Sequence, residues 1–484
     1  MTIELGNTLE LRRRQEASAQ RDRYAKYDPR ISDLSWYFYN VFYEKEGSIK
    51  YAPLIGEQAN AITAFVAFVM GDAPVMIKSW SGSGKSILAK TIETLVPDEM
   101  RYEIDMGSAM GPWYQNREIN ESSYVFFPEF QNSGDNKEVE KILKKWGEGA
   151  AARRSRADVT RSNAEEDATI DRVLECKPFF TTLAVENKTG ASIWNEEFGR
   201  RVIDLYTDVS EDQTRRVVQY MLEVYENGVK TMANMPTERK EMLLYHIRQC
   251  ITIKNDLVKE YRFPAASQML NQVPTKFVQS RSALPLLIKV MNSFSVFNYK
   301  NRIITEDGIL LVAPEDLYLA WACYGKRFAQ KCFNMEMLAD ELLQIFPKVK
   351  NPETPTRREQ LNEREIKIQL KTLKINITKQ KLTKLLESFV DAGILDTERS
   401  PEIQDETLYY RTGIDDFDQT FDYRQIIEHC KEAIKTQYPK YASEYIARFC
   451  TNPVVEHPFK PYKESLLNRQ DRHDIVREWK TFSE

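Results

Sequence analysis

The chain has few of the residues that build metal centres and disulfide frameworks. Its 484 residues include six cysteines and four histidines, and no two cysteines stand in a Cys-x-x-Cys pair. Such pairs are common ligands of structural zinc, and small secreted domains depend on cysteine for disulfides. The scarcity argues against both kinds of site. It fits a reducing compartment, so we expect a cytoplasmic protein.

Long apolar runs and a strong net charge are missing too. The longest apolar stretch, residues 61–70, is far shorter than the roughly 20 residues that span a bilayer. No secretory signal is recognisable at the N-terminus, and we expect no membrane partner. The formal net charge is −4. Any contact with nucleic acid must therefore come from local basic patches.

What the chain does contain is a phosphate-binding pattern between residues 74 and 92. Residues 74–77 are apolar, residues 79–84 form a small-residue loop, and residues 87–92 have a helical pattern. This strand–loop–helix order is the context of a P-loop, in which backbone N–H groups face phosphates. The first glycine of the usual G-x-x-x-x-G-K-[ST] pattern is replaced by Ser79. The alternative is a glycine turn that caps an ordinary helix.

The P-loop pattern predicts a binding site for ATP and magnesium. Lys85 would supply a positive charge to the phosphates, and the Ser86 hydroxyl would hold Mg²⁺. The predicted nucleotide-binding residues are Gly82, Ser83, Gly84, Lys85, Ser86 and Ile87.

The surrounding pattern predicts an α/β fold. Further strands are expected at 101–104, 124–127, 179–185 and 202–206, with a helix at 137–149. Strands that alternate with helices favour a parallel sheet with helices on both faces.

The predicted organisation has five parts. Residues 31–50 are rich in aromatic residues and favour a helix that packs on the body, the alternative being a contact surface. Residues 211–333 have a helical pattern, and three short helices followed by a β-ribbon are typical of a winged helix. The expected segments are an N-terminal helical extension (1–54), an ATPase core (55–210), a helical lid (211–333), a winged helix (334–412) and a C-terminal helical extension (413–484).

Polar residues follow two of the predicted strands. Glu129 comes after the third strand, where an acid would polarise the attacking water and help to hold Mg²⁺, although Pro128 replaces a first acid there. Asn187 follows the fourth strand and could orient the water. The alternatives are a surface glutamate and a turn asparagine.

Three arginines are candidates for contact with the γ-phosphate. Arg200 and, second, Arg201 precede the fifth strand, where an arginine could reach the nucleotide of a neighbouring subunit. Arg281 opens a helix in the lid segment. Each has the alternative of an ordinary surface arginine.

These elements, in this order, resemble AAA+ ATPases, and among them the MCM-like replicative helicases of plasmids and viruses. The resemblance covers about residues 55–412. It implies a ring, usually a hexamer, in which adjacent subunits share each ATP. It also implies that a hairpin between Glu129 and Asn187 projects into the ring pore and tracks DNA. Ser79 and Pro128 depart from the family pattern and favour a divergent relative from a mobile element.

The insert between residues 129 and 187 carries a cluster of positive charge. Such a cluster can contact backbone phosphates without base specificity, although a charge run is often only a solvated surface. The predicted DNA-binding residues are Lys144, Lys145, Arg153, Arg154, Arg156 and Arg161. The winged-helix segment has a second basic surface that would suit duplex DNA or protein docking.

The resulting expectation is a ring-forming, ATP-hydrolysing DNA helicase or translocase that acts in replication. Two alternatives remain: a replication initiator that binds duplex DNA through its winged helix, and a MoxR-like ATPase that remodels protein.

Overall fold

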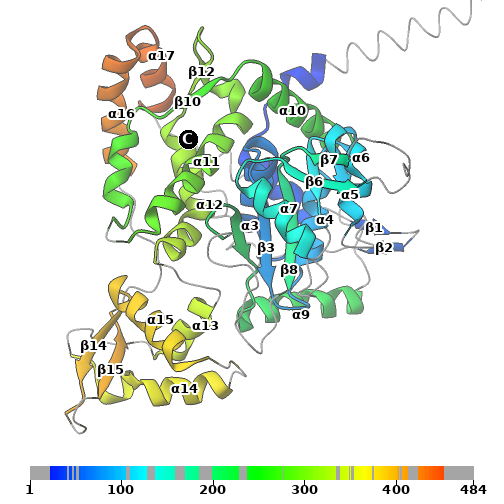
Figure 1. Ribbon diagram of the computed structural model, residues 1–484. Helices are drawn as coiled ribbons and strands as arrows, with labels where there is room; N and C mark the ends of the chain where they lie inside the picture. Colours follow the sequence, from blue (N-terminus) through cyan, green and yellow to red (C-terminus); the bar gives the residue numbers. More distant parts are fainter. Residues whose placement is uncertain are drawn as a thin grey trace, which may run out of the picture.

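The computed structural model (Figure 1) describes most of the chain. The described residues are 22–40, 43–45, 48–50, 54–104, 110–127, 137–157, 169–184, 199–227, 237–275, 277–333, 338–347, 349, 351, 354–372, 375, 377–401, 403, 406–412 and 423–451.

A five-stranded parallel sheet organises the first half of the molecule. Its spatial order is β4 (Arg101–Glu103), β5 (Tyr124–Phe126), β8 (Phe179–Ala184), β3 (Val75–Ser79) and β9 (Ile203–Tyr206). All four pairings are parallel. The prediction of a parallel α/β sheet is therefore confirmed. β3, the strand before the P-loop, lies between β8 and β9 and is hydrogen-bonded to both.

Helices cover both faces of this sheet, as predicted. Successive side chains of a strand point to opposite faces, so Val75 and Ile77 belong to one core cluster and Met76 to another. The first face packs against α3 (Gln58–Phe65), its π-helical continuation Val66–Met70, and α4 (Lys85–Glu93). The second face packs against α5 (Gly111–Tyr114), α6 (Asn116–Glu121) and α7 (Lys137–Gly147). The sequence pattern had not indicated α5 or α6.

The helical region that follows shares the first of these cores. Its helices are α9 (Glu211–Asn227), α10 (Thr237–Asp256), α11 (Ser280–Phe297) and α12 (Pro314–Cys332), with α2 (Ile31–Asn40), α16 (Tyr423–Gln437) and α17 (Pro439–Phe449) from the two ends of the chain. It also holds a small sheet that the sequence pattern missed, formed by β10 (Glu260–Arg262), β12 (Ile309–Leu311) and β11 (Ile303–Ile304). These strands have two or three residues each, which is too short for a clear alternating pattern.

Residues 338–412 supply most of a separate hydrophobic core, to which Ala329 and Phe333 at the end of α12 also belong. The elements are α13 (Leu338–Ile345), β13 (Leu361–Asn362), α14 (Glu363–Thr372), α15 (Lys379–Asp391), β14 (Leu395–Arg399) and β15 (Thr407–Arg411). The three strands form one antiparallel sheet in the order β13, β15, β14. In Figure 1 these elements stand apart from the main body at the lower left.

Two hairpins change the expected picture. The helix predicted for residues 31–50 stops at Asn40, and β1 (Tyr43–Lys45) pairs with β2 (Ser48–Lys50). The prediction is therefore confirmed for residues 31–40, whose helix packs on the core, and wrong for the two strands, because strands of three residues depend on their partner rather than on their own pattern. Between β5 and β8, β6 (Ala152–Ala157) pairs with β7 (Thr169–Leu174). A hairpin in this insert was what the family resemblance implied.

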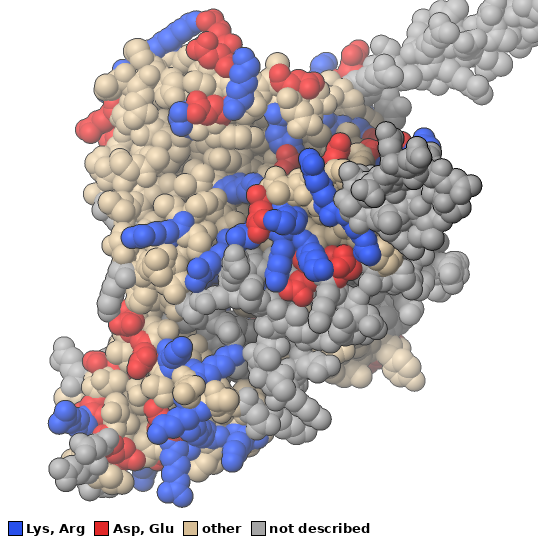
Figure 2. Space-filling view, in the orientation of Figure 1, with Lys and Arg blue, Asp and Glu red and all other residues tan. Residues whose placement is uncertain are grey.

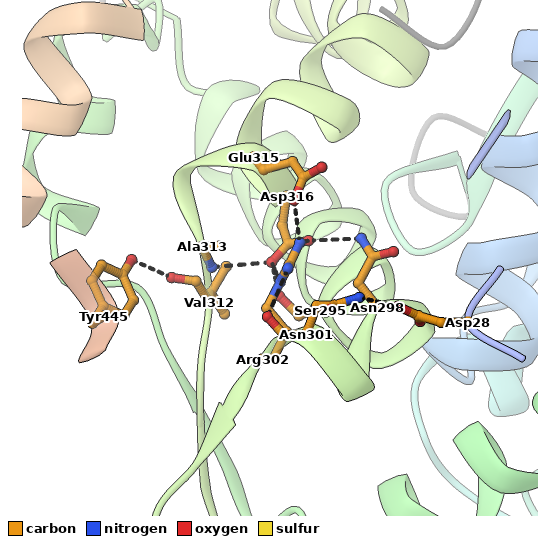
Figure 3. Close-up of polar contacts among 10 residues, drawn as sticks. All are labelled: Asp28, Ser295, Asn298, Asn301, Arg302, Val312, Ala313, Glu315, Asp316 and Tyr445. Carbon is orange, nitrogen blue, oxygen red and sulfur yellow. Dashed lines mark hydrogen bonds and ion pairs between the residues drawn. The ribbon is translucent and has the colours of Figure 1, made fainter. Parts of the chain in front are cut away.

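A buried polar cluster fastens the terminal segments to the helical region (Figure 3). Arg302 forms a two-pronged ion pair with Asp316, whose side chain is fully buried, with N–O distances of 2.8 and 2.6 Å. Beside it, Asn301 donates to Asp28 of the N-terminal segment. Tyr445 of α17 donates to the Val312 carbonyl at 2.8 Å. Both ends of the described chain are therefore bound to one place in the fold.

Candidate functional site

The P-loop lies where β3 ends and α4 begins. Gly82 and Gly84 have φ of 81° and 89°, a left-handed conformation that glycine adopts without strain. A Cβ atom added at either residue would meet nothing within 4 Å. The glycines are therefore required by the backbone conformation, and the space beside them is open. A loop with this shape at a helix N-terminus directs N–H groups at an anion.

Lys85 is folded back over the loop. Its side chain is buried, and Nζ donates to the Trp80 carbonyl at 2.7 Å. This contact closes the loop around the lysine and holds the ammonium group near the place where phosphates bind in a P-loop. Ser86 and Ile87, in the first turn of α4, are exposed. All three predicted residues therefore lie at the start of α4, where the helix N-terminus favours negative charge.

Buried polar atoms without a hydrogen-bond partner occur at the end of the sheet where its strands finish, which we call the P-loop edge. They are Ser79 Oγ at the end of β3, Ser83 Oγ in the P-loop, Thr207 Oγ1 after β9, and Gln213 Oε1 in the first turn of α9. Buried polar groups in folded proteins nearly always have a partner. The unused hydrogen-bonding capacity therefore fits a site for a polar ligand such as a nucleotide with Mg²⁺. Ser79, which replaces the usual glycine, belongs to this group.

Glu57 is a member of the same edge that sequence reasoning missed. It precedes α3, and its carboxyl accepts hydrogen bonds from Asp208 N at 2.7 Å and from Asn60 Nδ2 at 2.6 Å. Burial raises its pKa to about 8, despite these donors. Its position before a helix was visible in the sequence, but its burial depends on how β9 and α9 pack against α3. A carboxyl with a strongly raised pKa next to a ligand edge is a candidate functional group.

The two water-orienting candidates lie outside the described residues. Glu129 follows β5 by three residues, and Asn187 follows β8 by three. β8 pairs directly with β3, from Val75↔Phe180 to Ser79↔Ala184, and β5 pairs with β8. Because the carboxyl ends of parallel strands meet at one edge, β5 and β8 both end at the edge where β3 enters the P-loop.

Arg200 and Arg201 lie at the opposite edge, by which we mean the end of the sheet where its strands begin. The chain enters β9 beside the start of β3, where Ile203 N donates to the Pro74 carbonyl at 2.9 Å. The length of β3 separates this point from the P-loop, about 16 Å for five residues. Arg200 is exposed, and Arg201 is paired with Glu148 at 2.6 Å. Neither residue is placed beside the P-loop of its own chain.

Arg281 is connected to that same opposite edge. It is exposed in the first turn of α11. Just before it, Phe277 contacts Phe333 at the end of α12, with ring centroids 4.9 Å apart. The last turn of α12 in turn donates from Lys331 to the carbonyls of Gly199 and Val202. The contacts therefore bring the starts of α11 and β9 into one neighbourhood.

A buried charge cluster holds β9, β3 and α12 together. Asp204, 2% exposed, forms ion pairs with Arg327 at 2.6 Å, Lys331 at 2.6 Å and Lys78 at 3.3 Å. Burial alone would raise the pKa of Asp204, but these three cations hold it well below its usual value. Burial, with help from Arg327, lowers the pKa of Lys331 to about 8. The cluster fixes the position from which Arg200 and Arg201 emerge.

The predicted DNA-binding residues differ in how they are placed. Lys144 and Lys145 of α7 are paired with Glu140 at 2.6 Å and Glu148 at 3.1 Å, so part of the expected positive charge is balanced within the helix. Figure 2 shows lysines and arginines with acids among them on this face.

The remaining cations belong to the β6–β7 hairpin and its connection. Arg153 is exposed, and Arg154 is paired with Glu138 at 3.4 Å. Of Arg156 only the backbone is described, as part of β6, and Arg161 lies outside the described residues. Because successive side chains of a strand point to opposite faces, Arg153 and Arg154 lie on different faces of the hairpin, and the other two residues have no described side chain.

The comparisons with known proteins do not add to this geometry: no protein-family model matches the chain, and a search of curated proteins finds no match. Among the helices described, none has the length and apolar character needed to cross a membrane. Within the same residues, no group of three or more His, Cys, Asp or Glu side chains is placed to hold a metal ion.

Proposed function

We propose that the chain is an ATP-hydrolysing motor of the AAA+ kind that assembles into a ring and moves along DNA during replication of a virus or plasmid. The observation that carries this proposal is the edge of the sheet at β3. Left-handed glycines, a buried lysine and the unpartnered hydroxyls of Ser79 and Ser83 occur there just before and at the start of a helix. ATP with Mg²⁺ is the ligand class that uses all of these groups.

The two edges of the sheet support a nucleotide site shared between subunits. In this proposal one subunit supplies Lys85, Ser86, Glu129 and Asn187. Arg200, on the other edge, is too far from its own P-loop, and in the proposal it reaches the nucleotide of the next subunit, with Arg201 as the second candidate. Arg281 approaches from the same side, and cations placed there stabilise charge on the γ-phosphate. The proposed assembly is a hexamer.

The DNA track is proposed on the β6–β7 hairpin and its connection. Arg153 is exposed there, and the sequence adds Arg154, Arg156 and Arg161. The α13–β15 region offers a second surface if it acts as a winged helix, because Lys371, Lys379 and Lys384 are exposed. We assign single-stranded DNA to the hairpins and duplex DNA to this second surface.

The decisive experiment measures ATP hydrolysis with and without single- and double-stranded DNA, together with the particle mass in the presence of ATP. The expected result is a ring whose turnover rises on single-stranded DNA. Mixtures of Arg200→Ala and Glu129→Gln subunits should regain part of the activity that each variant lacks alone. In a mixed ring, some of the nucleotide sites between subunits combine an intact Glu129 with an intact Arg200. A particle that stays monomeric with ATP, and whose turnover ignores DNA, refutes the motor.

A replication initiator is the second candidate, and the pairing of Lys144 and Lys145 with glutamates favours it. An initiator does not need a strongly basic pore. It predicts slow turnover that single strands do not stimulate, and duplex binding that depends on Lys379 and Lys384. ATP hydrolysis indifferent to every form of DNA would favour the protein-remodelling alternative instead.

A further inference from the structure

Two arginines lie directly opposite each other on the β6–β7 hairpin. The register of the hairpin pairs Arg154 of β6 with Arg172 of β7. Side chains directly opposite on an antiparallel pair lie on one face of it, with Cβ atoms about 4.5–5.5 Å apart. Like charges at that separation repel each other and weaken the pairing of the strands. The pair is therefore costly unless a negative group lies close to it.

The described part of the chain supplies this pair with little negative charge. Glu138 is 3.4 Å from Arg154, but the same carboxyl group is 2.7 Å from Lys141. Arg172 has no ion pair among the described residues, and it donates instead to the carbonyl of Trp113 at 2.8 Å. The three cations have one carboxylate between them, so positive charge is in excess there and an anionic ligand would offset it.

Both arginines reach the short helix α5, where they meet an exposed aromatic ring. Arg154 donates to the sulfur of Met110, directly before α5. Arg172 lies over the ring of Tyr114, with Cζ 5.0 Å from the ring centroid. Tyr114 is 60% exposed, whereas Trp113 beside it is 3% exposed and belongs to the core on that face of the sheet. The packing of the hairpin on α5 thus brings two guanidinium groups to a solvent-facing tyrosine.

The surrounding contacts hold these groups in place. Asn120 of α6 is hydrogen-bonded to the end of β7: its Nδ2 donates to the Val173 carbonyl at 2.9 Å, and its Oδ1 accepts from Glu175 N at 2.9 Å. In Figure 1, α5, α6, β6 and β7 lie together at the upper right of the main body. Groups that the fold already fixes lose little conformational entropy when a ligand binds. The ring and the two arginines are therefore preorganised.

A flat ring next to two guanidinium groups matches the chemistry of a single-stranded nucleic acid. Aromatic side chains stack with bases whatever the sequence, because every base has a π-face. Guanidinium groups bind phosphates with two parallel hydrogen bonds. Bases inside a duplex are already stacked on both sides, so an exposed ring suits a single strand. A small anion would use the arginines and leave the tyrosine unused.

We propose that Tyr114, Arg154 and Arg172 bind single-stranded DNA, with a base stacked on the Tyr114 ring and a neighbouring phosphate between the two guanidinium groups. The choice of DNA rests on the proposed function. Tyr114 and Arg172 extend the basic cluster of the insert, and the sequence pattern indicated neither of them. The strand lies on the face of the hairpin that carries Arg154, not on the face that carries Arg153.

Binding of a fluorescent single-stranded oligonucleotide, measured by anisotropy over a range of salt concentrations, tests stacking and phosphate contact separately. Tyr114→Ala should weaken binding about tenfold and leave the salt dependence as in the parent protein, because no charge is removed. Tyr114→Trp should bind at least as tightly as the parent. Arg172→Ala should weaken binding and also flatten its salt dependence, since one phosphate contact fewer releases fewer counterions. A duplex of the same sequence should bind equally well to Tyr114→Ala and to the parent.

Two matched controls separate this site from general surface charge. Tyr225→Ala removes a tyrosine of α9 that is 91% exposed, and Arg117→Ala removes an arginine of α6 that pairs with Glu121 at 2.9 Å. Both should bind single strands as the parent does, and thermal unfolding of every variant checks that the fold is intact. Parent-like binding by Tyr114→Ala would overturn the proposal, as would an equal loss of affinity in Arg117→Ala.

Photocrosslinking locates the strand on the unmodified chain. A single strand that carries iodinated deoxyuridine is irradiated with the protein, and mass spectrometry should find the crosslink on Tyr114. Crosslinks at other residues only, or none, would count against the site. Tighter binding of the RNA strand of the same sequence would overturn the choice of DNA. The proposed motor fails separately, if ATP turnover ignores a strand that is bound at Tyr114.

Discussion

Two buried polar regions of this protein are satisfied to very different degrees. In the Arg302–Asp316 cluster, both carboxyl oxygens of Asp316 are used: Oδ2 accepts from Ser295, Arg302 and Ala313 N, and Oδ1 accepts from Arg302 and Asn298. At the P-loop edge, four buried polar atoms have no partner among the described residues. A protein tolerates unsatisfied buried groups where a ligand supplies the missing bonds.

This difference suits a structural role for the Arg302–Asp316 cluster, called the scaffold below, and a ligand-binding role for the P-loop edge, called the site. The Asp316 carboxylate caps α12 through Ala313 N and pairs with Arg302, so both of its oxygens have partners within the fold. At the P-loop edge, by contrast, buried polar atoms remain without a hydrogen-bond partner among the described residues. The same types of side chain, serine and a carboxyl, therefore have opposite roles in the two regions. The comparison predicts that substitutions in the first region reduce stability and that substitutions in the second reduce nucleotide binding.

The largest effect is expected from Asp316→Ala. It leaves the buried guanidinium of Arg302 without its two-pronged partner, which should reduce the free energy of unfolding by about 3–5 kcal/mol. Chemical denaturation followed by circular dichroism measures it. Glu315→Ala is the matched control, because Glu315 also pairs with Arg302 but is 37% exposed. Its cost should stay within about 1 kcal/mol. Equal costs for the two variants would contradict the scaffold assignment.

Lys85→Ala should abolish most ATP turnover and leave the stability of the fold unchanged. Loss of the P-loop cation is expected to reduce ATP turnover about 10²-fold or more, while the unfolding midpoint changes little. The control is Lys90→Ala, which removes a lysine in the last turn of the same helix. Steady-state turnover and thermal unfolding, measured on both variants, decide the matter. Unchanged turnover in Lys85→Ala would remove the P-loop assignment.

Glu57 should give the P-loop edge a pH dependence. Burial raises the pKa of Glu57 from 4.5 to about 8, so between these values the folded protein binds a proton that the unfolded chain releases. Stability should therefore fall as pH rises from 4.5 to 8, by a few kcal/mol and at most about 5 kcal/mol.

The measurement is the free energy of unfolding at several pH values, with Glu57→Gln as the comparison. The variant carries a neutral amide of similar shape, so it should lose most of this slope and be more stable than the parent protein near pH 8. A parent profile that rises with pH over this window would show that Glu57 is ionised in the folded protein.

The smallest effects come from a pair of serines. Ser83→Ala removes a hydroxyl without a partner, so stability should change little while ATP affinity falls. Ser295→Ala removes the hydroxyl that donates to Asp316 and should cost about 1 kcal/mol of stability without affecting ATP affinity. Isothermal titration with an ATP analogue and denaturant midpoints test both. Reversed results for the two serines would remove the distinction between the two regions.

Much of the fold could be predicted from the sequence, because the patterns that indicate strands and helices involve residues close together in the chain. The five strands of the parallel sheet and α7 were predicted within a few residues, since short apolar runs and helical spacing are properties of neighbouring residues. The β1–β2 hairpin and the β10–β12–β11 sheet were missed, because strands of two or three residues take their stability from their neighbours in the sheet rather than from their own pattern. The winged-helix, lid and DNA-binding assignments remain predictions.

The sequence by itself determined the P-loop: small residues, Lys85 and Ser86 follow an apolar run, and the left-handed glycines are needed wherever that loop forms. Only the tertiary structure decided which groups share its edge. The parallel pairing of β3 with β9 places Arg200 at the far side of the sheet and Thr207 at the near side. The packing around the start of α3 buries Glu57. Such placements depend on contacts between distant segments, and no local pattern of residues encodes them.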